Sequence, residues 1–211
     1  MSDASDQAGQ ETADLFGSRL PLAVRFHDLL KSHGEERGLV GPREMTKLWD
    51  RHIVNSALLT RVLPTSGTLV DVGSGAGLPG VVVAIARPDL CVDLIEPMER
   101  RTTWLEEVVT DLGLDNVTVK RGRAEEFHGV FEYELGTARA VAPLSRLARW
   151  CLPLVAPGGR FLALKGRRAE EEVSVAVKTL RKFNAESWCV RELPGLDEGE
   201  PTRVVEIIKK K

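Results

Sequence analysis

The sequence predicts an α/β fold with a doubly wound, mostly parallel sheet, and three observations carry that prediction. From Thr68 onward, strand-like apolar runs alternate with segments of helical periodicity. The first of these runs ends in a glycine-rich turn, Asp71 to Gly80, that leads into a helix. The last two strand-like segments, 187–193 and 203–209, follow one another without a helix, which predicts a closing antiparallel hairpin.

The elements of this domain are expected in a simple order. Pro79 suits the first turn of a helix and cannot lie inside a central strand, so the apolar run 81–86 is interpreted as a helix. We expect strands at 69–72, 91–95, 116–120, 135–141, 160–164, 187–193 and 203–209, with helices at 99–112, 144–155 and 169–182. This gives seven strands.

Length and composition predict one domain with an appendage. Of the 211 residues, 1–14 are polar and acidic and are expected to be disordered. Residues 15–64 show helical spacing of apolar positions and form a predicted N-terminal cap of helices at 15–34 and 44–63, and residues 65–211 form the α/β domain. No apolar run approaches the roughly 20 residues of a membrane span, so we expect no membrane partner, and we expect a monomer.

The cysteines exclude a zinc site in the sequence pattern. Cys91, Cys151 and Cys189 are isolated in apolar segments, and no Cys-x-x-Cys or Cys/His cluster occurs. An odd number of scattered thiols is typical of a reducing compartment. We therefore expect buried thiols, no metal and a cytoplasmic protein.

The glycine-rich turn predicts a nucleotide-type cofactor site, because glycines permit positive φ and let a ligand approach the backbone. Gly75 to Gly80 fits the GxGxxG fingerprint of dinucleotide sites, whereas Asp71 to Gly77 fits the acidic-x-Gly-x-Gly-x-Gly turn of S-adenosylmethionine-dependent methyltransferases. Asp71 would repel a pyrophosphate but could accept from the α-ammonium of an amino-acid cofactor. The second interpretation is therefore favoured, with Gly73 and Gly75 beside the cofactor.

Further candidates follow the ends of the later strands, where ligands of open α/β sheets bind. Glu96 lies 23 residues after Gly73, at the sequence separation of a ribose-binding carboxylate. The alternative is that Glu96 merely caps a loop. Ala124 and Glu125 follow the third strand and could read the adenine edge, although Glu125 could instead cap a short helix. Arg139 lies near the carboxyl end of the fourth strand, and either it pairs with an acid of the cleft or it faces substrate.

Two other stretches point to a polyanionic partner. Residues 139–169 contain no Asp or Glu but seven basic residues: Arg139, Arg146, Arg149, Arg160, Lys165, Arg167 and Arg168. A merely soluble surface is the alternative. In the cap, Trp49, Arg51 and His52 could stack on and grip RNA, or Trp49 could be core while Arg51 and His52 form hydrogen bonds at a helix junction.

The methyl acceptor is narrowed by what the chain lacks. No Pro-Cys turn is present for pyrimidine carbon-5 chemistry, and no Asn/Asp-Pro-Pro-aromatic motif for exocyclic amines follows the fourth strand. The four histidines show no clear link to the cleft, which leaves hydroxyl and carboxyl acceptors without a base. A ring nitrogen such as guanine N7 carries a free lone pair and requires only positioning.

A set of motifs carries a specific resemblance. Leu48 to Ile53, Asp71 to Gly80, Gly122 to Glu125, Arg139 to Ala142 and Leu164 to Gly166 occur in this order and spacing. Together they resemble the GidB/RsmG family of small-subunit ribosomal RNA guanine-N7 methyltransferases, from about residue 15 to the end. Asn55, where many members have Asp, and Glu96, which replaces a frequent Asp, depart from the pattern; glutamate still reaches ribose hydroxyls.

The resemblance implies a Rossmann-like class I methyltransferase with a helical N-terminal extension. It implies S-adenosyl-L-methionine as cofactor and a guanosine of 16S rRNA, in the 30S subunit, as substrate. The site that we expect holds the cofactor at Asp71, Gly73, Gly75, Leu78, Glu96, Ala124, Glu125 and Arg139, positions substrate with Arg139 and Lys165, and binds RNA through His52, Arg123, Arg167 and Arg168. A small-molecule or protein methyltransferase, an NAD-binding oxidoreductase and an RNA-binding protein without turnover are the alternatives.

Overall fold

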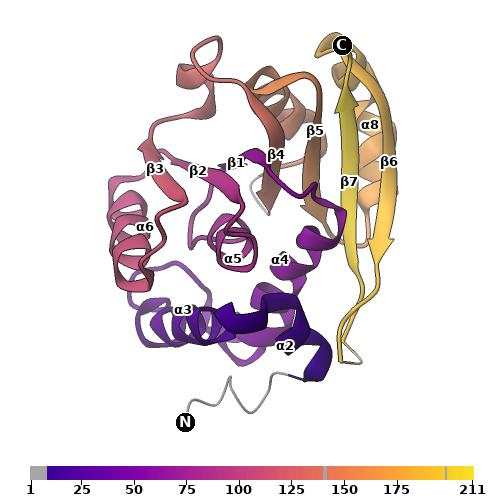
Figure 1. Ribbon diagram of the computed structural model, residues 1–211. Coiled ribbons are helices and arrows are strands. Elements are labelled where there is room, and N and C mark those ends of the chain that lie inside the picture. Colours follow the sequence, from indigo (N-terminus) through magenta and orange to yellow (C-terminus); the bar gives the residue numbers. More distant parts are fainter. Residues whose placement is uncertain (1–8, 140–141, 198) are drawn as a thin grey trace.

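A seven-stranded sheet forms the centre of the molecule, in the order β3-β2-β1-β4-β5-β7-β6 (Figure 1). The computed structural model describes residues 9–139, 142–197 and 199–211. The strands are β1 Gly67–Val72, β2 Leu90–Glu96, β3 Val117–Arg121, β4 Tyr133–Arg139, β5 Val155–Lys165, β6 Ala185–Leu193 and β7 Thr202–Lys209. The first five pair in parallel, and β7 runs antiparallel to both β5 and β6, so the predicted fold class and closing hairpin are confirmed.

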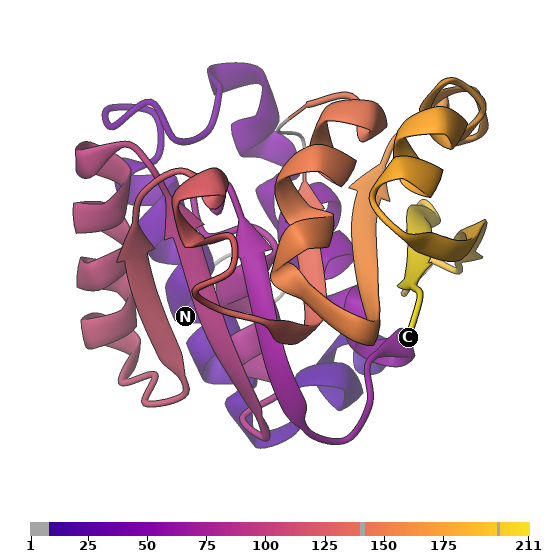
Figure 2. The same cartoon turned by 90° about the horizontal axis from the view of Figure 1, so that it is seen from above.

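Helices cover both faces of the sheet, as a doubly wound fold requires. The helices of the α/β domain are α5 Gly80–Ala86, α6 Glu99–Leu112, α7 Leu144–Cys151 and α8 Ala169–Lys182. Figure 2 shows the orange helices α7 and α8 in front of the sheet and the indigo and purple N-terminal helices behind it. One apolar cluster joins the N-terminal helices to α5 and α6, and a second joins the other face of the sheet to α7 and α8.

The N-terminal cap is more broken than its periodicity predicts. It comprises α2 Gln10–Phe16, a 3₁₀ turn at Gly17–Arg19, α3 Leu20–His33, a 3₁₀ turn at Pro42–Lys47, a π-helical segment at Leu48–Val54, α4 Asn55–Ala57 and a 3₁₀ turn at Leu58–Val62. The expectation of one or two regular helices over 44–63 is therefore wrong. Side-chain periodicity reports which face is buried, and it does not distinguish π and 3₁₀ turns from α-helix.

The expected disordered segment 1–14 needs a correction. Residues 1–8 lie outside the described residues, but Gln10 to Asp14 belong to α2. The backbone N–H groups of Glu11 and Thr12 donate to the carboxylate of Asp197 at 3.1 Å each, and the Thr12 hydroxyl donates to it at 2.6 Å. Because this acceptor comes from the loop between β6 and β7, the composition of residues 1–14 alone could not predict that α2 is folded.

Several other boundaries shift for local reasons. Helix α7 ends at Cys151 rather than at 155, because Pro153 lies two residues further on. Strand β5 begins at Val155, five residues earlier than expected, and passes through Gly158 at φ 78°. Helices α6 and α8 match their predicted ranges, whereas residues 140–141 of the expected fourth strand lie outside the described residues.

The three cysteines do not all lie in the core. Cys151 is buried, but Cys91 and Cys189 are exposed, so the expectation of three core thiols is wrong for two of them. The strand period of two explains Cys91, because its neighbour Val92 takes the buried side. Within the described ranges, no group of His, Cys, Asp and Glu is arranged to hold a metal, and no helix there is long and apolar enough to span a bilayer.

Candidate methyl-transfer site

The turn after β1 exposes backbone, as its glycines predict. Three glycines within it take positive φ, at 74°, 55° and 99°: Gly73, Gly75 and Gly77. Gly80 opens α5 and donates its N–H to Asp71 Oδ2 at 3.0 Å. A Cβ on Gly80 would lie 2.3 Å from Leu94 Cδ2 and 2.6 Å from that carboxylate oxygen, so no side chain fits there.

The Asp71 carboxyl group lies behind the turn and not at its open side. Asp71 has no exposed surface, and its Oδ1 is buried without a hydrogen-bond partner. Burial raises the pKa of Asp71 to about 7, against the opposing effect of the Gly80 N–H. Asp71 therefore shapes the start of α5, and the structure does not place it at the surface where a cofactor ammonium group would lie.

Glu96 closes the turn from the end of β2. Its Oε2 accepts from the Gly75 N–H and its Oε1 accepts from the Met98 N–H, both at 3.0 Å. Arg101 Nη1 lies 3.9 Å from Oε2. Each carboxylate oxygen keeps a further lone pair, so Glu96 can still accept from a ligand hydroxyl. The sequence placed a ribose-binding acid here, and the position supports that role.

A cavity of about 510 Å³ lies over this turn, and we refer to it as the glycine-turn cavity. It is lined by Leu39, Val40, Gly41, Glu44, His52, Gly73, Ser74, Gly75, Ala76, Leu78, Glu96, Pro97, Met98, Arg101 and Arg139. Five of the eight expected cofactor residues line it, and three do not: Asp71, Ala124 and Glu125. Ala124 is buried in a 3₁₀ turn, and the carboxylate that caps this turn belongs to Glu126, which accepts from the Arg123 N–H.

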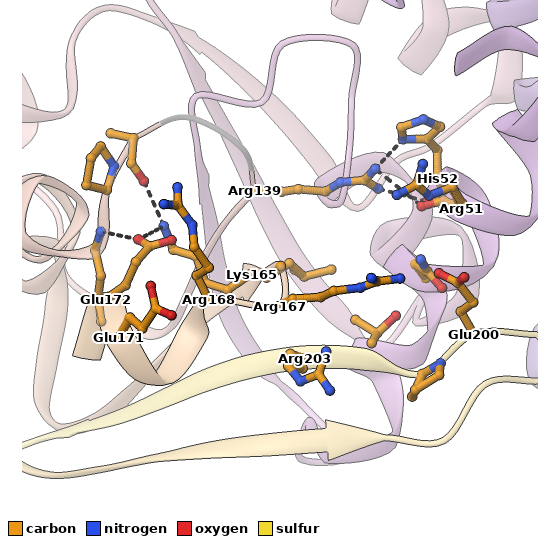
Figure 3. A pocket seen from close by; sticks show the side chains of 18 of the residues that line it. Arg51, His52, Arg139, Lys165, Arg167, Arg168, Glu171, Glu172, Glu200 and Arg203 are labelled. Atoms are coloured by element: carbon orange, nitrogen blue, oxygen red, sulfur yellow. Dashed lines mark hydrogen bonds and ion pairs between the residues drawn. The ribbon is translucent and has the colours of Figure 1, made fainter. Parts of the chain in front are cut away.

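A second and larger hollow of about 1180 Å³ adjoins the first, and we refer to it as the basic groove (Figure 3). Its cationic lining residues are Arg51, Arg139, Lys165, Arg167, Arg168 and Arg203, and His52 lies beside them. Acidic residues also line it: Glu44, Glu171, Glu172 and Glu200. Glu44, His52 and Arg139 line both hollows, so these three side chains form the shared wall between them.

Arg139 is bound into this wall by the cap. Its Nη1 donates to the His52 carbonyl and to Ser56 Oγ, both at 3.1 Å. Its Nη2 donates to the Arg51 carbonyl at 3.3 Å and to His52 Nδ1, and Figure 3 shows Arg139 reaching toward Arg51 and His52. These four bonds use the four terminal N–H donors of the guanidinium, which leaves the Nε–H. Burial lowers the pKa of Arg139 to about 10, so it stays charged at neutral pH.

His52 uses both ring nitrogens in the same wall. Nδ1 faces Arg139, and Nε2 lies 3.0 Å from Glu44 Oε2. Trp49 is 2% exposed and meets His27 edge-to-face, with ring centroids 5.8 Å apart. The cap motif thus follows its structural alternative, with Trp49 in the core and His52 at a helix junction, and RNA stacking on Trp49 is excluded by its burial.

Lys165 is also held within the protein. Its Nζ donates to the Ala142 carbonyl at 2.7 Å and to Glu172 at 2.8 Å, and its side chain is 7% exposed. The same Glu172 accepts from the Leu144 N–H at 2.8 Å. Lys165 therefore anchors the segment after β4 to α8, and one N–H of its ammonium remains for a ligand.

The acid-free run divides into two groups. Arg139, Lys165 and Arg160 are engaged internally, Arg160 with Glu206 at 3.1 Å. Arg167 and Arg168 are exposed, line the basic groove and form no salt bridge with any described residue. The predicted RNA-binding role thus fits these two best. Arg123 is exposed on the turn after β3 and lies outside the lining of both hollows.

Several residues in or next to the two hollows were not predicted from the sequence. Glu44, Ser56 and Arg203 had no motif around them, and Glu172 was one acid among three at the start of α8. Their roles depend on partners far along the chain. The one usable signal was Arg139 itself, because an arginine on a buried strand must find acceptors somewhere.

Comparison with protein families gives a match over most of the chain. The family model described as GidB, rRNA small subunit methyltransferase G, matches residues 19–197. A Beutenbergia cavernae protein named ribosomal RNA small subunit methyltransferase G is 54% identical over 193 residues, covering 92% of this chain and 91% of that protein. A Renibacterium salmoninarum protein of the same name is 47% identical, covering 99% of this chain and 97% of its own length.

Comparison with solved structures supports the fold. A putative S-adenosylmethionine-dependent methyltransferase from Methanococcus maripaludis aligns with TM-score 0.60 and 14% identity, over 75% of this chain and 86% of that chain. An rRNA methylase from Streptococcus thermophilus aligns with TM-score 0.52 and 17% identity, over 74% and 94% of the two chains. At these identities the likeness concerns the fold alone.

Proposed function

The chain belongs to the GidB family of ribosomal RNA small subunit methyltransferase G proteins, and from this premise we propose that it methylates N7 of a guanosine in 16S ribosomal RNA. The cofactor is S-adenosylmethionine. The observation that carries the proposal is the pairing of two adjoining hollows, one over a glycine-rich turn and one lined by cations, across a shared wall. The first hollow suits a nucleoside cofactor, and the second suits a polyanion.

The glycine-turn cavity fits the cofactor on two observations. Gly73 and Gly75 line it with open backbone, and the Glu96 carboxylate retains lone pairs for ribose hydroxyls. We propose that Gly73, Gly75, Leu78 and Glu96 contact the cofactor directly. Asp71 would act through the turn that it stabilises, and Ala124 and Glu125 would reach the adenine only from the neighbouring 3₁₀ turn.

The basic groove would hold the RNA strand. Arg167 and Arg168 present unpaired guanidinium groups at its surface, and such groups bind phosphate strongly. The acids of the groove, including Glu171 and Glu200, would exclude a second phosphate path and guide the strand past the wall. His52 and Arg139, as part of the wall, would lie beside the target base. They would not bind the phosphate backbone of the RNA.

The chemistry requires no general base in this site. S-adenosylmethionine supplies an electrophilic methyl group when it is bound. The lone pair of guanine N7 would form the new bond to that methyl carbon as the carbon–sulfur bond breaks and S-adenosylhomocysteine leaves, so the protein would have to align and desolvate the base rather than remove a proton. This agrees with the wall, where both nitrogens of His52 are engaged by Arg139 and Glu44. The Lys165 ammonium, with one N–H left over, could donate to the base O6.

We propose that residues 15–64 act as a cap on the α/β domain of residues 65–211, since α3 packs on α5 and α6 and Arg139 ties Leu48–Val54 to β4. We further propose that the protein acts as a monomer in the cytoplasm, on 16S rRNA or on the 30S subunit.

The test is methyl transfer from labelled S-adenosylmethionine to 30S subunits that lack the modification, followed by mapping of N7-methylguanosine. Deproteinised 16S rRNA, a panel of metabolites and ribosomal proteins are assayed in parallel, with Glu96→Ala as the inactive control. We expect one labelled guanosine in 16S rRNA. Label in a metabolite or a protein and none in RNA would overturn the proposal in favour of another methyltransferase on this fold.

A further inference from the structure

His52 occupies a position where its protonation state is set by its neighbours. A guanidinium has no acceptor, so the contact between Arg139 Nη2 and His52 Nδ1 requires a lone pair on Nδ1. The ring proton then belongs on Nε2, from which it donates to Glu44 Oε2 at 3.0 Å. The geometry therefore assigns a neutral imidazole in the Nε2–H tautomer, joining Glu44 to Arg139.

A second proton on the His52 ring would break the hydrogen bond between His52 and Arg139. Nδ1 would become a donor facing another donor, and two positive charges would be in contact. Arg139 would lose one of its four terminal acceptors and be pushed from the wall, while its other three acceptors belong to the Leu48–Val54 segment and to Ser56. The wall is thus stable only with neutral His52.

The surrounding charges favour the neutral form. Burial is the main influence that lowers the pKa of His52, and the Arg139 charge adds to it. Glu44, from the preceding 3₁₀ turn, opposes the shift, and Arg51 on the same segment supports it. Across the glycine-turn cavity, Glu96 and Arg101 contribute one charge of each sign, 3.9 Å apart.

We propose that His52 is a positioning residue for methyl transfer, which as a neutral imidazole locks Arg139 into the wall between the glycine-turn cavity and the basic groove. The effect on methyl transfer rests on the proposed function, whereas the tautomer of His52 rests on the hydrogen bonds alone. Loss of the lock on protonation lets the wall move, so that cofactor and target base are no longer aligned. His52 does not touch the reacting atoms in this account, and it acts through Arg139.

The structural half is tested without any assay of activity. Long-range ¹⁵N–¹H spectra of the ¹⁵N-histidine-labelled full chain report the tautomer of each of its four histidines, and the resonances that vanish in His52→Asn identify His52. We expect a neutral Nε2–H ring at pH 7.5 that titrates below pH 6.5. An Nδ1–H tautomer, or titration above pH 6.5, would overturn the lock whatever the substrate of the enzyme.

The functional half compares substitutions across a pH series. Asn places an amide oxygen near the position of Nδ1 and does not titrate, whereas Ala removes the acceptor. In the wild type, kcat/KM for 30S subunits should fall in acid with the midpoint that the spectra give for His52. His52→Ala should lose on the order of tenfold at pH 8, and His52→Asn should recover most of that loss and lack the acid fall assigned to His52.

The matched control is His33→Asn, at the end of α3, where His33 meets Trp104 and lies outside both hollows. It should keep the wild-type pH profile. An acid fall unchanged in His52→Asn would refute the functional half, because another group would then be titrating. If no RNA is methylated at all, the proposed function fails, and the spectra still decide the lock.

Discussion

The glycine-turn cavity and the basic groove are built in opposite ways. The cavity draws its floor from one short stretch, Gly73 to Leu78, and from Glu96 at the end of the adjacent strand. The groove gathers side chains from positions as distant as Arg51 and Arg203. In the proposed function, local backbone shape would recognise the nucleoside cofactor, whereas the polyanion would meet side chains that come together only when the chain has folded.

The shared wall does not fit this contrast, because it belongs to both hollows. Arg139 comes from β4 and all four of its terminal donors bind the cap, over sequence separations of 83 to 88 residues. A residue expected to contact ligands thus holds two halves of the protein together. Changes at the wall should affect both hollows, and changes on either side of it should affect one.

The largest effect is expected from Arg139→Ala, because this change removes a side chain of the wall that the two hollows share. Ser56 Oγ, His52 Nδ1 and two carbonyl oxygens lose their donor in a partly buried place, at a cost of about 3 kcal/mol in unfolding free energy. Urea unfolding measures this, and both cofactor and RNA affinity should fall together.

A conservative change and a surface arginine complete that experiment. Arg139→Lys keeps the charge but has three donors, so an intermediate loss is expected. Arg61→Ala removes an exposed arginine with one long bond of 3.4 Å to the Pro194 carbonyl and should stay within about 0.5 kcal/mol of wild type. Loss of RNA affinity alone in Arg139→Ala would show that the wall belongs to the groove only.

The second effect is confined to the glycine-turn cavity. Glu96→Ala removes the acceptor of the Gly75 and Met98 N–H groups and the proposed ribose ligand, so the Kd for S-adenosylhomocysteine should rise on the order of 100-fold. Isothermal titration calorimetry measures it. Glu99→Ala, whose 72% exposed side chain pairs with Arg121, is the control and should bind normally. Equal weakening of RNA binding in Glu96→Ala would contradict the separation of the two hollows.

The sequence predicted the features that depend on local signals and missed those that depend on distant parts of the chain. The turn, Glu96 and helices α6 and α8 were predictable because their signals lie within one element or one loop. The hydrogen-bond partners of Arg139 and Lys165 could not be predicted, because Ser56 and Glu172 among them carry no local signature, and the ligand-binding roles of the two residues stay predictions. The order of α2 was missed for the same reason, since Asp197 caps it from the far end of the chain.

The third effect is confined to the basic groove. Arg167→Ala with Arg168→Ala removes two cations that form no salt bridge with any described residue, so RNA affinity should fall on the order of tenfold and the log–log salt slope should lessen by about 1.4. Filter binding at several salt concentrations measures both. Arg181→Ala with Lys182→Ala removes equal charge from the far end of α8, about 20 Å along the helix, and should change neither as much.

The smallest effect concerns the turn itself and separates its stability from its ligand contacts. Because burial raises the pKa of Asp71 to about 7 from an ordinary value of 3.8, the native apoprotein binds this proton more tightly than the unfolded chain does. Its contribution to stability is therefore full below pH 3.8 and is lost as pH rises through 7. Asp71→Asn keeps an acceptor for the Gly80 N–H and should show a shallower fall in unfolding free energy between pH 5 and 8, as urea titrations measure. Exposed Asp115→Asn should retain the wild-type slope, and a slope in Asp71→Asn equal to that of the wild type would mean that Asp71 is already ionised in the folded turn across this pH range.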